Sequence, residues 1–442
     1  MPVGGDEVSA NGRRDGTRRV VVTGMGVVTP IGETPAEFSA SLRAGRSAIA
    51  HWKHMDERTR SKIGGDMCEF DLGAHFERVG GGYPPALIKQ ARKVLRATPL
   101  TGRLAGAAAL QAYLDAGLHD TELDPERVGH VGGGNNLNNN YFVENVRVFD
   151  QDPDSIDPHL GMVFWDTDVL GKVGELLTIK GPNFMVGNAC ASGNAALLCA
   201  VDLLRAGRVD TVVVSAATQE LDPVALQGWA LMDALVWQSF ADAPTQASRP
   251  FDARRQGFVP GEGAGAVILE TLAGARARDA RIHAELLGGV LTCDATRLPK
   301  PVVEGQVRVM RGALRDAGVT PEQVNYINAH GTSTVLADAA EVEAIKQVFG
   351  DHAYRIPINA TKSMLGHCLT AAGLVELVAL LVQMQDGYLH PTINLDEPEP
   401  GFGLDFVPHK ARRYAIEIAM SNSFGFGGLN ACVVVGRAPS EP

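Results

Sequence analysis

The chain is short of cysteine, of basic residues and of long apolar runs. Its six cysteines in 442 residues include no CxxC pair and no spacing typical of metal ligands, so we expect free thiols, a reducing compartment and no metal centre. No segment approaches the roughly 20 uninterrupted apolar residues of a membrane-spanning helix, and the N-terminus lacks the apolar region of a secretory signal. The sequence therefore predicts a cytoplasmic protein without a membrane anchor.

Acidic residues outnumber basic ones by 51 to 40, which gives a net charge of -11. This balance argues against nucleic acid as a general partner. What the chain does have is a large apolar fraction, 45% of its residues, and enough length to bury a substantial core. These properties are typical of a large folded enzyme.

Strand-like apolar runs alternate with helical periodicity along most of the chain. Residues 1–17 are polar and aperiodic, and we expect a flexible leader there. The remainder predicts an α/β protein with layered sheets, divided near residue 270 into halves 18–270 and 271–442. The clearest strands are expected at 19–26, 211–215, 265–269, 326–329 and 431–435, and the clearest helices at 103–116, 193–206, 305–317, 337–349 and 369–385.

Three short segments place a reactive side chain beside glycine and follow strand-like stretches. They carry Cys190 (NACASG, 188–193), His330 (AHGTST, 329–334) and His367 (KSMLGH, 362–367). The first and third run into long helices, so we expect Cys190 and His367 at helix N-termini. Such a position can lower a thiol pKa from about 8.5 into the range of roughly 3.5 to 7.5. Cys190 is therefore a candidate nucleophile, whereas the other five cysteines are interpreted as small core residues.

The order of strand, small-residue turn, reactive residue and long helix occurs around Cys190 and again around His367. Two related halves would bring both helix starts together. A nucleophile from one half would then meet histidines from the other at the carboxyl ends of central strands.

The whole set of segments resembles the β-ketoacyl-acyl carrier protein synthases of the thiolase-fold superfamily. The resemblance runs from about residue 18 to residue 435, and its motifs are 19–32, 188–193, 248–252, 257–263, 328–334, 362–367 and 421–428. It implies a five-layered α-β-α-β-α fold built from two similar halves. It also implies condensation of an acyl group held on a thiol with a malonyl thioester carried by an acyl carrier protein.

The resemblance assigns roles to residues in these motifs. Cys190 matches the acyl-accepting nucleophile, and His330 and His367 match the two histidines that donate hydrogen bonds to the enolate formed when malonyl loses CO₂. Lys362 matches the family lysine near the site, with Glu341 as its expected partner and Asp338 as a structural acid. Thr332 and Thr334 match threonines that bind the pantetheine arm. The resemblance implies that the backbone N–H groups of Cys190 and Phe426 form an oxyanion hole and that the Phe426 ring gates the acyl pocket. Gly425, Gly427 and Gly428 would let this loop move.

An acidic carrier protein needs a basic docking surface. Lys89, Arg92 and Lys93 lie at the family-like spacing on one face of a predicted helix, and Arg96 extends that face by one turn. A solvated helix face explains the same pattern equally well.

Several departures from the family pattern surround the substrate. Arg297, Leu298, Pro299 and Lys300 stand where elongating enzymes carry a Thr-Ser pair for pantetheine, and Val335 and Ala337 replace the usual Pro and Gly. The segment 132–141 is unusually rich in asparagine, and 215–220 replaces a Gly-Gly strand end. These changes favour a specialised pathway, such as polyketide biosynthesis, over general fatty acid elongation.

Three alternatives to a condensing enzyme stay open. The first is a malonyl-carrier protein decarboxylase of polyketide β-branching, whose members usually lack the cysteine. The second is a ketosynthase active only in a heterodimer, or a non-catalytic partner subunit that shapes chain length. The third is a thiolase dependent on coenzyme A, which would want a second cysteine where this chain has Ser423 and Phe424. The family is dimeric, so we expect a homodimer or heterodimer, and no cofactor beyond the phosphopantetheine that the carrier protein brings.

Overall fold

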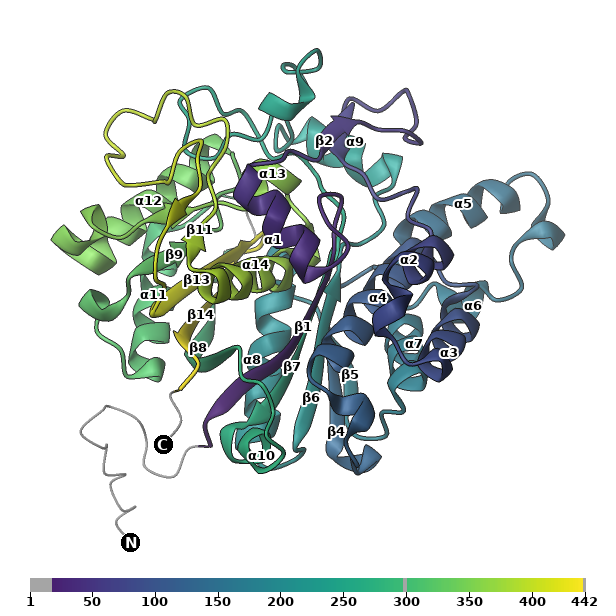
Figure 1. Ribbon diagram of the computed structural model, residues 1–442. Helices are drawn as coiled ribbons and strands as arrows, with labels where there is room; N and C mark the ends of the chain where they lie inside the picture. The colour runs from purple at the N-terminus through teal and green to yellow at the C-terminus, as the bar shows by residue number, and fades with distance from the viewer. Residues whose placement is uncertain (1–17, 297–299, 440–442) are drawn as a thin grey trace, which may run out of the picture.

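A computed structural model describes residues 18–296 and 300–439 of the chain. The expected leader at 1–17 and the replaced residues Arg297, Leu298 and Pro299 lie outside the described residues. Figure 1 shows a sheet through the middle of the molecule with helices on both sides and between its halves.

The main sheet has ten strands in the order β10-β9-β13-β14-β8-β1-β7-β6-β4-β5. The first half of the chain supplies β1 (Val20–Val28), β4 (Val128–Gly133), β5 (Asn183–Val186), β6 (Thr211–Ala217) and β7 (Ala264–Thr271). The second half supplies β8 (Ala284–Cys293), β9 (Tyr326–Asn328), β10 (Ile358–Asn359), β13 (Ile418–Gly425) and β14 (Leu429–Arg437). Short two-stranded sheets pair β2 (Ile49–His51) with β3 (Ile63–Gly65), and β11 (Tyr388–Leu389) with β12 (Arg412–Arg413).

The two halves of the sheet have the same topology. In the first half, β5, β4 and β6 are parallel neighbours, and β7 and then β1 follow in antiparallel pairing. In the second half, β10, β9 and β13 are parallel neighbours, and β14 and then β8 follow in antiparallel pairing. The halves meet where β1 pairs with β8 over three residues, Val20 to Val22. This repeated order confirms the expectation of two similar halves.

The alternation of side chains along buried strands produces the layers. On β14, Val433 and Val435 belong to the central apolar cluster, whereas Cys432 and Val434 belong to an outer one. The central cluster contains α8 (Ser192–Arg205) and α14 (Ala372–Asp386). One outer layer is built on α4 (Leu100–Asp115) and α7 (Thr167–Leu177), and the other on α11 (Val303–Ala317) and α12 (Val335–Phe349). Figure 1 shows the resulting α-β-α-β-α order.

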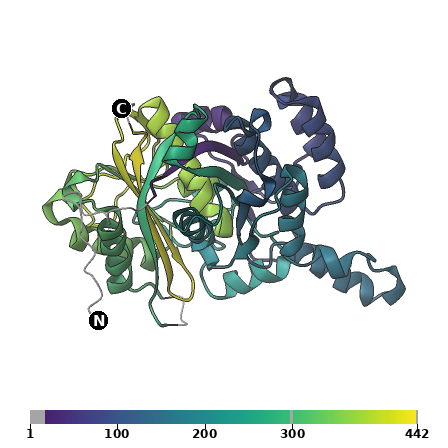
Figure 2. The same cartoon turned by 90° about the horizontal axis from the view of Figure 1, so that it is seen from below.

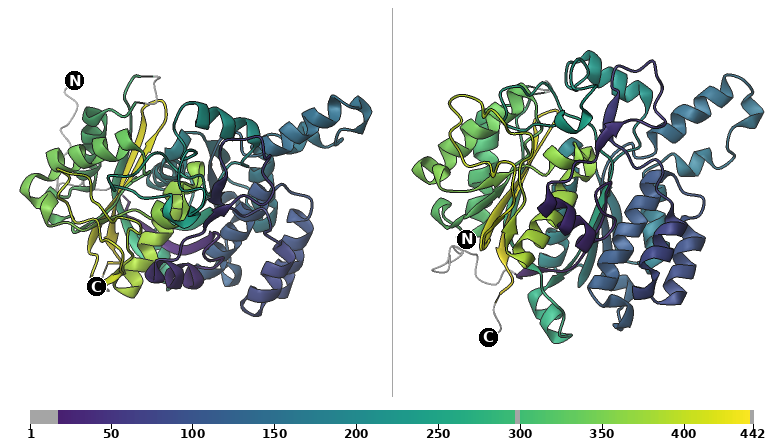
Figure 3. Two further views of the ribbon diagram at one scale, coloured as in Figure 1. Left: turned by 90° about the horizontal axis from the view of Figure 1, so that it is seen from above. Right: turned by 45° about the horizontal axis from the view of Figure 1, so that its top comes forward.

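Eight further α-helices belong to the described part of the chain. Figures 2 and 3 show α5 and the short helix after it projecting away from the body as an arm. The helices are α1 (Pro35–Ala44), α2 (Leu72–Val79), α3 (Pro85–Leu95), α5 (Asn139–Phe149), α6 (Leu160–Val163), α9 (Pro223–Leu231), α10 (Leu272–Ala277) and α13 (Lys362–Leu365).

The two central helices approach closely at their N-termini. A Cβ added to Gly193 would lie 2.8 Å from the Leu374 nitrogen, and one added to Gly373 would lie 2.8 Å from the Asn194 nitrogen. The expectation that both helix starts lie together is therefore confirmed. Glycine at both positions is what permits the contact.

The position expected for His367 is wrong. Its chain segment passes through a 3₁₀ turn, Leu369–Ala371, before α14 begins, just as the 3₁₀ turn Ala189–Ala191 precedes α8. Ala189 and Leu369 both have positive φ, 48° and 46°. The residue that corresponds to Cys190 in the second half is therefore Thr370, and His367 precedes that turn.

The stretch Leu369–Asp386 is long and apolar enough to cross a membrane by composition, but 89% of it is buried inside the fold. It is the central core helix of the molecule. Its apolar surface is already covered by both halves of the sheet.

Candidate active site

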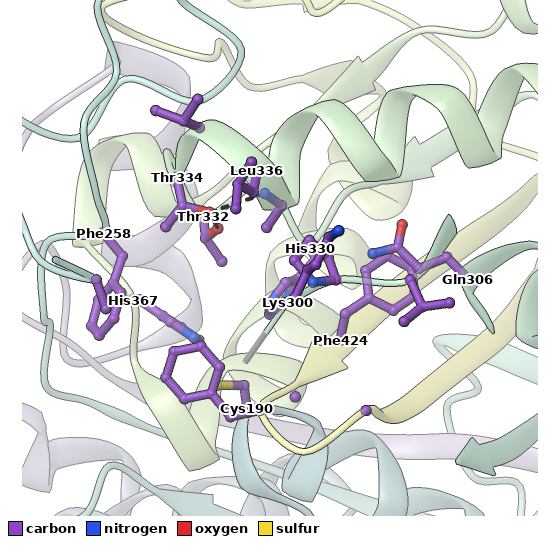
Figure 4. A pocket seen from close by; sticks show the side chains of 18 of the residues that line it. Cys190, Phe258, Lys300, Gln306, His330, Thr332, Thr334, Leu336, His367 and Phe424 are labelled. Atoms are coloured by element: carbon purple, nitrogen blue, oxygen red, sulfur yellow. Dashed lines mark hydrogen bonds between the residues drawn. The ribbon is translucent and has the colours of Figure 1, made fainter. Parts of the chain in front are cut away.

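The three predicted segments meet at one pocket of about 470 Å³, a size typical of small-molecule sites. Cys190, His330 and His367 line it, as do Thr332 and Thr334 and the hairpin residues Phe424, Gly425, Phe426 and Gly428. Figure 4 shows Cys190 at one end of the pocket, with His330 and His367 above it and the threonines farther away.

Cys190 sits in the tight turn that leads into α8. The Ser192 hydroxyl holds this turn by donating to the Ala189 carbonyl (2.7 Å) and accepting from the Asn188 N–H (2.8 Å). Only 9% of Cys190 is exposed. The turn therefore presents one largely buried thiol to the pocket.

Burial raises the pKa of Cys190 to about 11, and the charge of Lys362 opposes the rise without cancelling it. The expectation of a lowered thiol pKa is thus wrong for the ligand-free protein. The desolvation of a thiolate in this closed pocket outweighs the favourable field of the helix start. Cys190 rests as the neutral thiol at pH 7.

The hairpin between β13 and β14 brings a backbone amide to the cysteine. The backbone N–H groups of Phe426 and of Cys190 itself favour the charged form of the thiol and oppose part of the rise in its pKa. A Cβ on Gly425 would lie 2.9 Å from the Asn188 carbonyl, so glycine allows the hairpin to reach this far. The turn itself uses positive φ at Gly427 (84°) and Gly428 (71°).

The two histidines lie face to edge, with ring centroids 5.4 Å apart and an interplanar angle of 86°. Burial, together with the charge of Lys362, lowers the pKa of both rings well below 6.5, so both are neutral at pH 7. His367 Nδ1 accepts the Leu369 N–H at 3.2 Å, which leaves the proton on Nε2. Among the described residues this Nε2 has no hydrogen-bond partner although it is buried.

Lys362 is 2% exposed and forms its ion pair with Glu376 of α14. Its Nζ also lies 3.5 Å from His330 Nδ1, so the ring can accept there and direct Nε2–H elsewhere. The expectation that Glu341 pairs with Lys362 is therefore wrong. Glu341 instead accepts the backbone N–H groups of His330 (2.9 Å) and Gly331 (2.8 Å).

Sequence reasoning missed several residues of this site. The signal for Glu376 was available, because it is the lone acid in the apolar run of α14 and a buried carboxylate needs a cation. Phe424 and Phe258 pack edge-on against His330 and His367 at 5.8 and 5.5 Å, and no motif indicated these contacts. Asn422 donates to Glu341 at 3.0 Å and completes the polar layer behind the histidines.

Two models of one family match most of the chain. Beta-ketoacyl synthase, N-terminal domain, matches residues 17–275, and Beta-ketoacyl synthase, C-terminal domain, matches residues 283–396. The chain belongs to the β-ketoacyl synthase family.

Relatives and solved structures agree with this membership. The chain is 37% identical to 3-oxoacyl-[acyl-carrier-protein] synthase 2 of Coxiella burnetii over 95% of its own length and 99% of that protein. It is 36% identical to the polyketide biosynthesis malonyl-ACP decarboxylase PksF of Bacillus subtilis, over 94% and 96%. It is similar to the ishigamide ketosynthase/chain length factor structure, with TM-score 0.85, 33% identity and coverage of 96% and 100%. A type II polyketide synthase carrier protein in complex with its ketosynthase gives TM-score 0.83 at 31% identity, with coverage of 96% and 100%.

The remaining predicted residues of this β-ketoacyl synthase lie as follows. The hydroxyls of Thr332 and Thr334 are 3.0 Å apart on the pocket wall. Lys89, Arg92 and Lys93 lie on α3, which contributes nothing to the pocket and lies on the opposite flank from α12 in Figure 1. Within 18–296 and 300–439, no group of three or more His, Cys, Asp or Glu is placed to hold a metal ion.

Proposed function

We propose that the protein catalyses decarboxylative condensation of an acyl group held on Cys190 with malonyl-acyl carrier protein. One observation carries this proposal: the backbone amides of Cys190 and Phe426 favour negative charge at the Cys190 thiol, and two neutral imidazoles share its pocket. The two amides suit transfer of an acyl group to sulfur, and the two imidazoles suit formation of an enolate.

In the first step, the Cys190 sulfur attacks the carbonyl of an acyl thioester, and the amides of Cys190 and Phe426 stabilise the oxyanion. The carrier thiol leaves with the proton that Cys190 loses. Since the resting thiol is neutral, attack and proton transfer must be coupled. The product is an acyl thioester on Cys190.

In the second step, the malonyl carboxylate leaves as CO₂ and its electron pair forms an enolate. His330 and His367 donate N–H groups to the thioester oxygen on which the charge develops. Removal of one preorganised donor of this kind costs about 10²–10³ in rate. The enolate carbon then attacks the acyl group, and Cys190 leaves as a thiolate that takes up a proton.

The second candidate function is decarboxylation of malonyl-acyl carrier protein without condensation. The similarity to PksF favours it. Both reactions use the histidines, but the decarboxylase has no need of an acylated cysteine. The presence of Cys190 in the same pocket as the two histidines favours condensation.

We propose the acyl carrier protein as partner and a dimer as the working assembly. β5 is an edge strand of the sheet, and its residues Asn183 and Phe184 are exposed. Phe142 of α5 and Trp165, which lies between α6 and α7, are exposed as well. An exposed apolar edge of this kind is normally covered, and a second copy or a related subunit could pair with it.

Lys89, Arg92 and Lys93 remain our proposal for contacts with the acidic carrier protein. Charge reversal of the three should raise KM for carrier-bound substrates and leave turnover of free malonyl thioesters unchanged. Equal effects on both substrate classes would contradict the docking role.

The chemistry calls for no metal or organic cofactor, since CO₂ loss provides the driving force and the arm arrives on the carrier protein. All six cysteines are free thiols, as expected in a reducing compartment, and we propose a cytoplasmic location. We also propose a specialised pathway such as polyketide biosynthesis.

The test uses intact-mass spectrometry of the protein and its products with a panel of acyl-carrier proteins and malonyl-carrier protein. Wild type should gain an acyl group and release a β-ketoacyl product, and Cys190→Ala should do neither. Acetyl-carrier protein as the sole product, without an acyl-enzyme, would establish decarboxylation instead. Inactivity that only a second subunit relieves would identify a heterodimer.

A further inference from the structure

Gln306 lines the pocket, takes no part in the proposed chemistry and has a side-chain oxygen without a hydrogen-bond partner among the described residues. It lies in the first turn of α11 and is 1% exposed. Its Oε1 atom is buried without a hydrogen-bond partner among the described residues. A buried polar atom without a partner is destabilising, so an amide in a pocket wall is expected to pair with a ligand.

Apart from His367 Nε2, which the proposed chemistry uses, several polar groups of the pocket already have partners. Thr332 and Thr334 hydrogen-bond each other at 3.0 Å, and Thr334 also caps α12 by accepting the Ala337 N–H at 3.3 Å. Asn430 donates to Asp294 at 2.9 Å. Figure 4 shows Gln306 across the pocket from the two threonines, with the Phe424 ring beside it. Gln306 and the two threonines thus belong to different walls of the pocket that ends at Cys190.

The chemistry of the missing partner follows from what a carboxamide offers. It has both donors and an acceptor, and its terminal torsion is broad and roughly two-fold, so rotation can present either atom. The malonyl unit and a saturated acyl chain supply only acceptors. An amide supplies an N–H and a carbonyl together, and therefore matches both atoms of Gln306.

We infer that Gln306 recognises the amide nearest the thioester in the arm that delivers the substrate. This inference rests on the proposed function. Gln306 is a positioning residue for the arm: it holds the thioester carbonyl beside Cys190 and the histidines and takes no part in bond making.

The test compares three malonyl thioesters with one acyl-enzyme acceptor. The S-(N-acetylcysteamine) ester has the amide, the S-(4-oxopentyl) ester keeps only its carbonyl, and the S-pentyl ester has neither. Gln306→Met, which is close in shape, should lower kcat/KM for the amide ester by roughly three- to tenfold, the size of one hydrogen bond. It should leave the S-pentyl ester unchanged, and the S-(4-oxopentyl) ester should fall between.

Two controls keep the result interpretable. Gln347→Met alters an exposed glutamine on α12 and should change none of the three rates. Gln306→Ala repeats the comparison with less bulk, in case Met perturbs the pocket.

Equal losses with all three esters, or no loss with the amide ester, would overturn the inference. Equal losses with the amide and oxopentyl esters would overturn it too, because the amide N–H would then play no part. If wild-type protein turns over none of the thioesters or carrier-bound substrates, the proposed function itself fails.

Discussion

At the scale of single residues, the resting state of Cys190 is the most informative feature of the site. Burial keeps the pKa of its thiol near 11, so the sulfur is not ionised before the substrate binds. The backbone amides of Cys190 and Phe426 favour negative charge at this position. A buried neutral thiol resists oxidation and alkylation. Reactivity then depends on the substrate whose oxyanion the same amides can stabilise.

This state predicts how Cys190 responds to pH. Since the thiolate is the reactive form and the pKa is raised, the rate of alkylation by iodoacetamide should rise about tenfold per pH unit from pH 7 to 9.5 without a plateau. Peptide mapping separates Cys190 from the exposed Cys293, and Cys190→Ser gives the background. A plateau below pH 8 would show a lowered pKa and contradict the prediction.

Lys362 and Glu376 form a buried ion pair that ties α13 to α14 behind the histidines. Removal of one partner leaves an uncompensated charge in the core, which typically costs about 3–5 kcal/mol. Glu376→Leu should therefore lower the midpoint of urea unfolding strongly. The double variant Lys362→Met with Glu376→Leu should recover much of this loss.

If Glu376→Leu and the double variant unfold at the same midpoint, the two residues are not coupled and the pairing is wrong. Glu341→Gln is the matched comparison. Adding Lys362→Met to Glu341→Gln should not restore stability, because Glu341 accepts hydrogen bonds from backbone N–H groups and does not pair with Lys362.

At the scale of elements, the β13–β14 hairpin decides whether the oxyanion hole exists. Its turn holds the Phe426 amide against the cysteine through two glycines with positive φ. A Cβ on Gly428 would also lie 2.7 Å from the Asp294 Cβ, whereas one on Gly427 meets nothing within 4 Å.

Gly427→Ala and Gly428→Ala therefore form a matched pair. Both carry the left-handed backbone cost of roughly 1–2 kcal/mol, but only Gly428→Ala adds a clash that displaces the turn. The rate of Cys190 acylation, measured by intact-mass spectrometry over time, should fall at least tenfold more in Gly428→Ala than in Gly427→Ala. Equal rates would show that the turn position is immaterial to acyl transfer.

At the scale of the whole molecule, the sheet ends in an edge that a monomer leaves open. β5 pairs only with β4 in the described chain, and its Phe184 is 37% exposed. The strand lies directly before Cys190, so pairing across this edge would also fix the turn that carries the nucleophile.

Phe184→Asp should convert the proposed dimer to a monomer, as measured by light scattering, because a charge at the centre of an apolar interface is costly. Loss of acyl transfer should accompany it. Tyr354→Asp changes another exposed aromatic residue on the second half and should leave the mass unchanged. A dimer that survives Phe184→Asp would place the interface elsewhere.

The linear sequence by itself determined the elements and the reactive residues of this protein. Apolar periodicity located strands such as β1 and helices such as α4 and α8, because the side chains that an element buries recur at the period of that element. The motifs around Cys190, His330 and His367 identified the residues that now line one pocket.

Only the tertiary structure decided how these residues are paired and charged. Glu376 displaced Glu341 as the partner of Lys362, Thr370 replaced His367 as the counterpart of Cys190, and the thiol pKa rose where a helix start alone predicted a fall. Each of these depends on which groups from distant segments share a low-dielectric interior. Desolvation and ion pairing act across space, and no local spacing in the chain encodes them.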